Sequence, residues 1–407
     1  MGMIINIDEA LKLRSDYNIL KEPLHEMMRK QQEAWERENP IDFLFSRNTI
    51  GSFQETYTSS IGFAHAFAET SDYAVGPIFN TAEGFAATYR TRTFQGGFIV
   101  TQQALEDRQY GRIKDDASRF VTRWHGDIVE YCMTAIDAGF GVERTFNDGD
   151  GKSRLKLMSA DTVDGDINNT TKNPLFYKEH KTVKREDGTG AITQSNMFYA
   201  NVDIIGNDAG ALPKLADAIN QVITQMENYK DDNGKYAGVL GAKTIVCANE
   251  PHLKAALETV LAMDQFKQGE SLAINPAYKR ATLKTTPYLN DINACKIDET
   301  KHFGCGFFIV DKSYNEANHG PELTERIPFT LEAFNHREAP QGIKYEGRQR
   351  FDINVASWRG ITYVYLGTPS STSTDWNYSG KFTSLTLKST IAKPVTVVGT
   401  VTTQAAN

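Results

Sequence analysis

The stretch "RTFQGGFIVTQQALEDRQYGRIKDD", Arg92 to Asp116, passes from strand to helix with almost nothing between. Up to Val100 it is rich in Thr, Phe, Ile and Val, which favour β structure. From Thr101, whose hydroxyl can cap a first turn, the apolar spacing is helical and continues to about Ala138, roughly 55 Å at 1.5 Å per residue. No catalytic group stands at the junction, so the stretch predicts a structural spine helix instead of an active-site loop.

Two glycines bear on the limits of this helix. Gly139 follows its last apolar residue, where a left-handed C-cap is favoured, and Gly111 is a candidate break in its first turns.

The segment before the spine, residues 51–100, differs from the rest because it contains no Lys and is rich in Phe, Tyr, Thr and Gly. Its strand pattern "EGFAATYRTRTFQGGFIV" alternates, and "YAVGPIFN" before it is the expected partner in a long hairpin. One side of the pattern carries Phe85, Ala87, Tyr89, Thr91 and Thr93. Since a hairpin alone is only marginally stable in water, these aromatic side chains predict a docking surface.

The N-terminal segment is helix-prone and densely charged. Leu20 and Leu24 belong to a thin apolar stripe that is too narrow for an independent core. Residues 1 to about 45 are therefore expected to form an arm that packs on something else, with another copy of the chain as one candidate.

The composition and charge of the whole chain argue against several classes of protein. The 407 residues, 40% apolar and 23% charged, are ordinary for a globular protein, and no apolar run approaches the roughly 20 residues that span a bilayer. The N-terminus shows no secretory signal, so the product is expected to stay in the cytosol. A formal charge of −7 argues against a protein that grips nucleic acid along a basic surface. The four cysteines form no CxxC pair and are expected to be reduced and buried.

Two tempting motifs fail on inspection. "DGDGKS" lacks the first Gly of a phosphate loop, because Phe146 stands there. "DGDINN" starts like a calcium loop, but Asn169 replaces its turn Gly and Leu175 its bidentate Glu. No catalytic, cofactor-binding or metal-binding residues are therefore assigned, and the chain is predicted not to be an enzyme.

"FIVTQQALED" enters the spine, and five weak motifs follow it in fixed order: "NPLFYKEHKTV", "KTIVCANEPHLKAALETVL", "KTTPYLND", "HFGCGFFIVD" and "RFDINVASWRGITYVYLG". Together with the order of the elements, these motifs resemble the major capsid protein of tailed bacteriophages, the Hong Kong 97-type fold, and Mu-like head subunits in particular. The resemblance covers about residues 45 to 367. A polar insertion near 184–196 and the tail after Gly367 depart from it.

The resemblance implies an α+β fold in six parts. These are an N-terminal arm (1–50), an E-loop region (51–100), a P-domain with the spine at about 101–138 (101–205), mainly A-domain (206–340), P-domain closing strands (341–369) and a C-terminal extension (370–407).

It also implies function. The chain would self-assemble into hexamers and pentamers of an icosahedral phage head around double-stranded DNA, which it would contact only weakly and without specificity. It would be a virion component assembled in the host bacterial cytoplasm with a portal and a separate scaffolding protein, without cofactor or membrane. Candidate contacts between subunits are Phe85, Tyr89, Arg90, Arg92, Leu20 and Leu24.

Two other functions stay open. One is an encapsulin-like shell around cargo protein. The other is a DNA- or sugar-binding module that uses the aromatics of residues 50–100 for stacking, although only Arg90 and Arg92 supply positive charge there.

Overall fold

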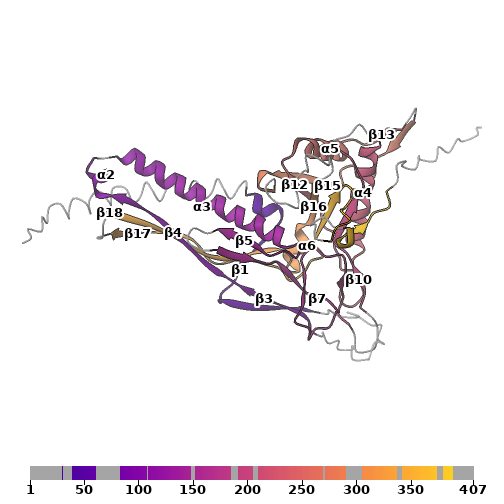
Figure 1. Cartoon of the computed structure of the whole chain (residues 1–407), viewed down its shortest axis with the longest axis horizontal. Helices are drawn as coiled ribbons and strands as arrows, with labels where there is room; N and C mark the ends of the chain where they lie inside the picture. Colours follow the sequence, from indigo (N-terminus) through magenta and orange to yellow (C-terminus); the bar gives the residue numbers. More distant parts are fainter. Residues whose placement is uncertain are drawn as a thin grey trace, which may run out of the picture.

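The computed structural model describes residues 39–60, 83–107, 109–147, 152–184, 191–204, 210–268, 271–289, 305–336, 342–373 and 379–387, together with Lys30. Helices and strands are mixed throughout, so the α+β class expected from the sequence is confirmed. The molecule is elongated: a long helix lies along a narrow sheet at one end, and a wider sheet with its own helices forms the other end (Figure 1).

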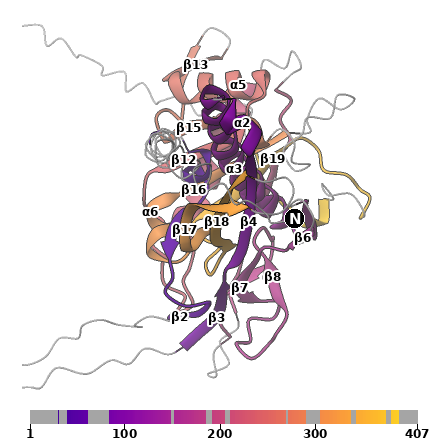
Figure 2. The same ribbon diagram turned by 90° about the vertical axis from the view of Figure 1, so that its left-hand side faces the viewer.

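The narrow sheet has four strands in the order β1 (Ser46–Thr49), β17 (Glu322–His336), β18 (Gly342–Asn354) and β4 (Arg92–Thr101). β1 and β17 are parallel, and the other pairs are antiparallel. Figure 2 shows β17 and β18 on one side of β4. Three distant parts of the chain thus build one sheet.

The long helix α3 (Tyr110–Ala138) packs on one face of this sheet through aromatic side chains. Phe120 contacts Phe98 with ring centroids 5.3 Å apart, and the Trp124 indole N–H donates to Gln349 Oε1 at 2.9 Å. The predicted spine helix is confirmed. Its face toward the sheet is the apolar stripe that the sequence spacing defines.

The ends of the spine differ in detail from the sequence prediction. Thr101 does cap, since the Ala104 amide donates to its Oγ1 at 3.4 Å, but it caps a separate short helix, α2 (Gln102–Glu106). The break before α3 comes earlier than Gly111, which lies inside α3. Gly139 has φ −65°, and the left-handed residue is Gly141 at φ 82°. At Gly139 a Cβ would meet the Ile136 carbonyl oxygen at 2.9 Å, so close packing is what requires the glycine there.

The wider sheet has six strands in the order β15-β12-β16-β19-β11-β20. Their bounds are Ala281–Thr286 (β15), Lys243–Ala248 (β12), Cys305–Asp311 (β16), Ile361–Leu366 (β19), Met197–Ala200 (β11) and Thr383–Ser384 (β20). The helices of this end are α4 (Ala211–Glu227), α5 (Pro251–Ala262) and α6 (Lys312–Ala317). α5 begins after Glu250, whose carboxylate accepts from the Leu253 amide at 2.6 Å, and Pro251 is its first residue.

Five two-stranded ribbons and three short 3-10 helices complete the described fold. The ribbons are β2 (Gln54–Ser60) with β3 (Glu83–Arg90), β5 (Arg144–Asn147) with β6 (Lys152–Leu155), β7 (Met158–Thr162) with β8 (Lys172–Pro174), β9 (His180–Lys181) with β10 (Thr193–Gln194), and β13 (Gln265–Gln268) with β14 (Ser271–Ile274). The 3-10 helices are η1 (Pro40–Phe43), η2 (Pro287–Leu289) and η4 (Ser379–Lys381).

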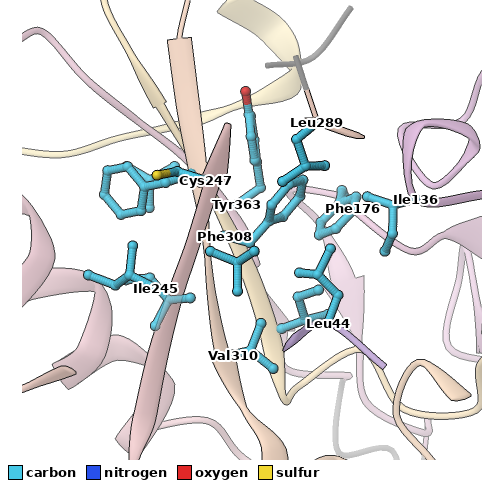
Figure 3. Close-up of a cluster of buried hydrophobic side chains, with 14 of the residues drawn as sticks. Leu44, Ile136, Phe176, Ile245, Cys247, Leu289, Phe308, Val310 and Tyr363 are labelled. Atoms are coloured by element: carbon cyan, nitrogen blue, oxygen red, sulfur yellow. The ribbon is translucent and has the colours of Figure 1, made fainter. Parts of the chain in front are cut away.

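One apolar core joins the two ends of the molecule. Figure 3 shows Leu44 and Ile136, from the turn after η1 and from α3, beside Phe308 and Tyr363 from the six-stranded sheet. All four side chains are at most 1% exposed. The spine helix and the wide sheet are therefore held together as one folded unit.

The structure corrects three strand pairings that the sequence led us to expect. The partner of strand 83–90 is β2, whereas "YAVGPIFN" lies outside the described residues. After Thr91 the chain leaves this ribbon, and 92–101 joins the four-stranded sheet. Residues 341–369 divide between two sheets, since β19 pairs with β16 and β11 in the wide one. Both pairings join residues far apart in sequence, which local alternation does not report.

In the described part of the chain, no helix combines the length and the apolar character that crossing a membrane requires.

Candidate assembly surface

The β2–β3 ribbon is the described root of the region that the sequence marks for docking. Phe85, Ala87 and Tyr89 point from β3 toward the chain's own body, where they pack with Ala160 and Val183. Phe85 is 3% exposed and Tyr89 is 1% exposed. The alternation was read correctly, but this face fixes the ribbon to its own subunit.

The opposite strand of the root contributes Tyr57. Its ring lies 4.6 Å from that of Tyr89 and 4.3 Å from that of His319, measured between centroids. Its hydroxyl donates to Glu55 at 3.0 Å and accepts from the Asn48 amide at 3.3 Å. Burial raises the pKa of Tyr57, and the hydrogen bond from Tyr57 lowers the pKa of Glu55. The phenol therefore stays protonated beside an ionised carboxylate.

His319 connects this root to the four-stranded sheet. It occupies the left-handed region, with φ 52°, in the turn before β17. Its carbonyl oxygen accepts from the amides of Ala356 and Ser357, each at 2.9 Å, and its Nδ1 lies 3.2 Å from the carboxylate of Glu322. That hydrogen bond raises the pKa of His319 above its usual value. Glu322 itself is 3% exposed and also accepts from Asn48 at 3.0 Å.

Arg92, one of the predicted contact residues, is engaged within the chain. Its Nε lies 3.0 Å from the Asp352 carboxylate, and its Nη2 donates to the Arg154 carbonyl oxygen at 3.0 Å. Tyr131 of the spine donates to the same carboxylate at 2.7 Å. Arg92 therefore links β4, β18 and α3 within its own subunit instead of reaching a neighbour.

Arg90 keeps an exposed side chain, while its backbone is fixed at both ends. Its amide donates to the Asn354 side chain at 3.4 Å, and its carbonyl oxygen accepts from that side chain at 3.3 Å. Of the six predicted contact residues, Arg90 is the one that the described structure leaves at the surface of the root. Leu20 and Leu24 lie outside the described residues.

The densest polar cluster in the interior surrounds Asp161. His180 lies 2.9 Å from its carboxylate, the side chains of Ser159 and Asn173 donate to it, and the ring of Trp358 stacks on His180 at 4.1 Å. The pKa of Asp161 stays low: burial opposes its charge, but His180 and the hydrogen bonds outweigh that effect. Because His180 is 0% exposed, this cluster joins segments and offers no substrate access.

A search of the described residues for three or more His, Cys, Asp or Glu side chains arranged to hold a metal ion finds no such group.

Sequence reasoning missed Asn48, Tyr57, His319 and Glu322. They come from three separate parts of the chain, and none stands in a spaced motif. The aromatic enrichment of residues 51–100 was the one local signal, and it pointed to Tyr57 only as one ring among many.

Comparison with known proteins gives structural matches alone. No family model matches the sequence, and no curated protein matches it. The chain is similar to a virus-like particle from Pyrococcus furiosus, at 9% identity and a TM-score of 0.40, covering 85% of this chain and 98% of that one. It is similar to the mature capsid of bacteriophage PhiM1, at 9% identity and a TM-score of 0.44, covering 81% and 87%.

A third similar structure is that of Mycobacterium phage Patience, at 12% identity and a TM-score of 0.42, covering 91% of this chain and 92% of that one.

Proposed function

We propose that this chain is a major capsid protein, a structural subunit that assembles into hexamers and pentamers of an icosahedral phage head enclosing double-stranded DNA. The observation that carries the proposal is an elongated body with one shared core and, beside it, a separate two-stranded ribbon whose described part packs on that body. α3 and the six-stranded sheet share one core, and β2–β3 leaves that core as a separate two-stranded ribbon.

Contact with an adjacent subunit would stabilise such a ribbon. Two strands alone are marginal in water, and within the described residues the face with Phe85 and Tyr89 is the one that packs on the chain's own body. The connection between β2 and β3, residues 61–82, has two acidic residues and no Lys or Arg in its sequence. Contact with an adjacent subunit removes apolar surface from water at about 25 cal/mol per Å², less the cost of ordering.

Repetition multiplies this contact. In a closed symmetric assembly each subunit makes the same contacts with its neighbours, so modest individual interfaces add up to a stable shell. The net charge of −7 suits a wall that does not hold packaged DNA tightly, because phosphate contacts require basic residues. A portal and a separate scaffolding protein belong to the same proposal, as does assembly in the host cytoplasm.

The test is expression of the full chain followed by negative-stain and cryo-electron microscopy. Closed shells with hexameric and pentameric units are expected, in the presence of a scaffolding protein if the chain alone forms irregular particles. A chain that stays monomeric under both conditions would contradict the proposal. Particles isolated from their source, with tails and dense DNA, would distinguish a phage head from the encapsulin-like alternative, which would enclose protein cargo.

The same proposal covers catalysis and the arm. We expect no enzymatic turnover by the particle that depends on a residue of this chain.

The N-terminal arm must end before residue 41, because Ile41, Leu44 and Phe45 are at most 1% exposed and belong to the core. Removing residues 1–38, and not 1–45, is therefore the deletion that should leave a folded subunit with poor assembly.

A further inference from the structure

The outer edge of β4 is a long strand edge without a partner strand in the described structure. β4 has ten residues, and in the part of the chain that the structure describes it pairs only with β18. The pairing runs in continuous register from Arg92 opposite Phe351 to Thr101 opposite Gly342. The backbone groups directed away from β18 therefore form a regular row, which is a template for another strand.

Protein sheets ordinarily block such an edge with charge, Pro or a bulge. Residues 93–105 contain no charged residue and no Pro, and the β4–β18 ladder has no register shift. The opposite edge of this sheet, β1, is four residues long and carries Arg47, and the β15 edge of the wide sheet carries Lys284. In β4 the one charged residue is Arg92 at the start of the strand, and residues 93–101 carry none of these devices.

The sequence of this edge is complementary to itself. If two copies of "TFQGGFIVT", Thr93 to Thr101, are laid antiparallel about a two-fold axis at Gly97, Thr93 faces Thr101 and Phe94 faces Val100. Gly96 then faces Phe98, whose ring can cover a glycine. Thr–Thr and aromatic–β-branched pairs are among the cross-strand pairs that stabilise antiparallel sheets.

From this we infer that β4 pairs with β4 of a second copy of the chain, antiparallel and about a two-fold axis at Gly97. This pairing keeps each face of the sheet continuous across the two copies. Phe94 and Phe98 point toward α3, where they contact Tyr131 and Phe120 respectively. Each of them lies opposite another even-numbered residue, which is on the same face of the sheet. The two sheets become one of eight strands, with both spine helices on the same face. No charge is buried along the edge between residues 93 and 101.

This contact goes beyond the proposed function and is independent of it. Rings of subunits need head-to-tail contacts, whereas a two-fold contact joins two subunits face to face through the same patch. In a shell it would join subunits of adjacent rings. The two ideas can fail separately, because shells can form without β4 pairs and pairs can form without shells.

The experiment uses the double variant Gln95→Cys/Ile99→Cys in the full chain, both as soluble protein and in particles. In the inferred pair Gln95 of one copy faces Ile99 of the other, and directly opposed Cβ atoms lie about 4.5–5.5 Å apart. Mild oxidation, or a short thiol-reactive linker, should convert most of the chain to a dimer that reductant or linker cleavage reverses. Within one strand the two positions are about 13 Å apart, so they cannot join to each other.

The matched control is Thr93→Cys/Gln95→Cys, which has two thiols on the same exposed face but out of register. It should remain monomeric on a denaturing gel, as should the unmodified chain, which carries the same four native cysteines, Cys132, Cys247, Cys295 and Cys305, and so measures any cross-link that they form. A dimer yield in the first variant no higher than in this control would overturn the inference. A ladder beyond the dimer would also overturn it, because a two-fold pair stops at two chains.

Hydrogen exchange on the unmodified chain covers the case in which the cysteine variant does not fold. A ladder with β18 alone protects alternate amides of β4, and a strand on each side protects all of them. Slow exchange throughout 93–101 in the assembled protein supports the pairing. Fast exchange of about half of these amides would refute it.

Discussion

His319 is the residue at which the ribbon root, the turn before β17 and the end of β18 meet. Its pKa is raised above 6.5, chiefly by the hydrogen bond to Glu322. A raised folded-state pKa means that the protonated form stabilises the fold. This contribution is complete below pH 6.5 and is lost as the pH rises through the raised value.

We therefore expect His319→Asn to remove a stabilisation that the unmodified chain has on the acidic side of that pKa and lacks on the alkaline side. Asn tolerates the left-handed backbone but does not titrate, so it isolates the charge. Denaturant midpoints across this pH range measure the effect, with Glu322→Gln as the matched change in the partner. Equal pH profiles for the variant and the unmodified chain would contradict it.

The loss of folding stability at low pH comes from other residues. Asp161 and Asp311 have lowered pKa values, because His180 and Lys243 respectively outweigh the effect of burial. Their contributions are present above the usual carboxyl pKa and disappear as the pH falls through the lowered values. His319 therefore contributes a loss of stability as the pH rises through its raised pKa, and these two carboxylates contribute a loss as the pH falls through theirs.

Lys243 and Asp311 form an ion pair at the first residue of β12 and the last of β16, with Nζ 2.7 Å from Oδ2. The side chains are 3% and 0% exposed. We expect Lys243→Met to cost about 3–5 kcal/mol in the free energy of unfolding, since it leaves a buried carboxylate without its cation. Denaturant titration of the unassembled chain measures this.

The control for that prediction is Lys243→Met/Asp311→Asn. The Tyr314 amide now donates to Asp311 Oδ1 at 3.0 Å, and the side-chain oxygen of Asn can accept the same hydrogen bond. The substitution removes the buried charge. The double variant should recover part of the loss. If it is less stable than Lys243→Met alone, the isolated charge is not the cause.

At this scale the sequence predicts which residues share a face and not what that face meets. The alternation of Phe85, Ala87 and Tyr89 is correct, but their partners Ala160 and Val183 lie some seventy residues or more away. Arg92 likewise pairs with Asp352, and no local sequence pattern predicts this ion pair. Whether a buried face contacts its own subunit or a neighbour depends on such distant contacts.

Among the elements, β4 shows how close packing decides the tolerance of a strand. A Cβ on Gly96 would lie 3.4 Å from the Trp124 ring, an ordinary contact, whereas a Cβ on Gly97 would lie 2.4 Å from the Tyr345 carbonyl oxygen. We expect Gly97→Ala to destabilise the chain by about 1–3 kcal/mol and Gly96→Ala by clearly less. Thermal unfolding of the two variants in parallel makes the comparison. Equal losses would show that general strand propensity, and not the close approach, determines the cost.

The elements that sequence predicts best here are those defined by local chemistry. The spine helix follows from a three- and four-residue spacing, and α5 from the apolar spacing after Pro251. The strand partners follow from no local rule. β1 pairs with β17 more than 270 residues away, and β2 with β3 across an intervening segment.

For the whole molecule, the decisive feature is that one core of buried side chains unites the spine with the wide sheet. The division of the chain into successive domains is less informative than this. Residues 41–45, expected in an arm, lie in the core, and β17 belongs to the narrow sheet although most of 206–340 builds the wide one.

The last prediction concerns how subunits are fastened in a shell. An isopeptide bond from the ribbon would need a lysine amine, and the sequence has no Lys between Lys30 and Lys114. Arg90, which is exposed at the root, cannot replace it, because a guanidinium stays protonated and is a poor nucleophile. Cys132 and Cys247 are buried, and burial raises the pKa of both thiols, so neither is a reactive thiolate for a disulfide between subunits. Intact particles boiled in denaturing detergent should therefore give a single band near 45.4 kDa, whereas a ladder of multimers that survives reductant would show a covalent bond between subunits.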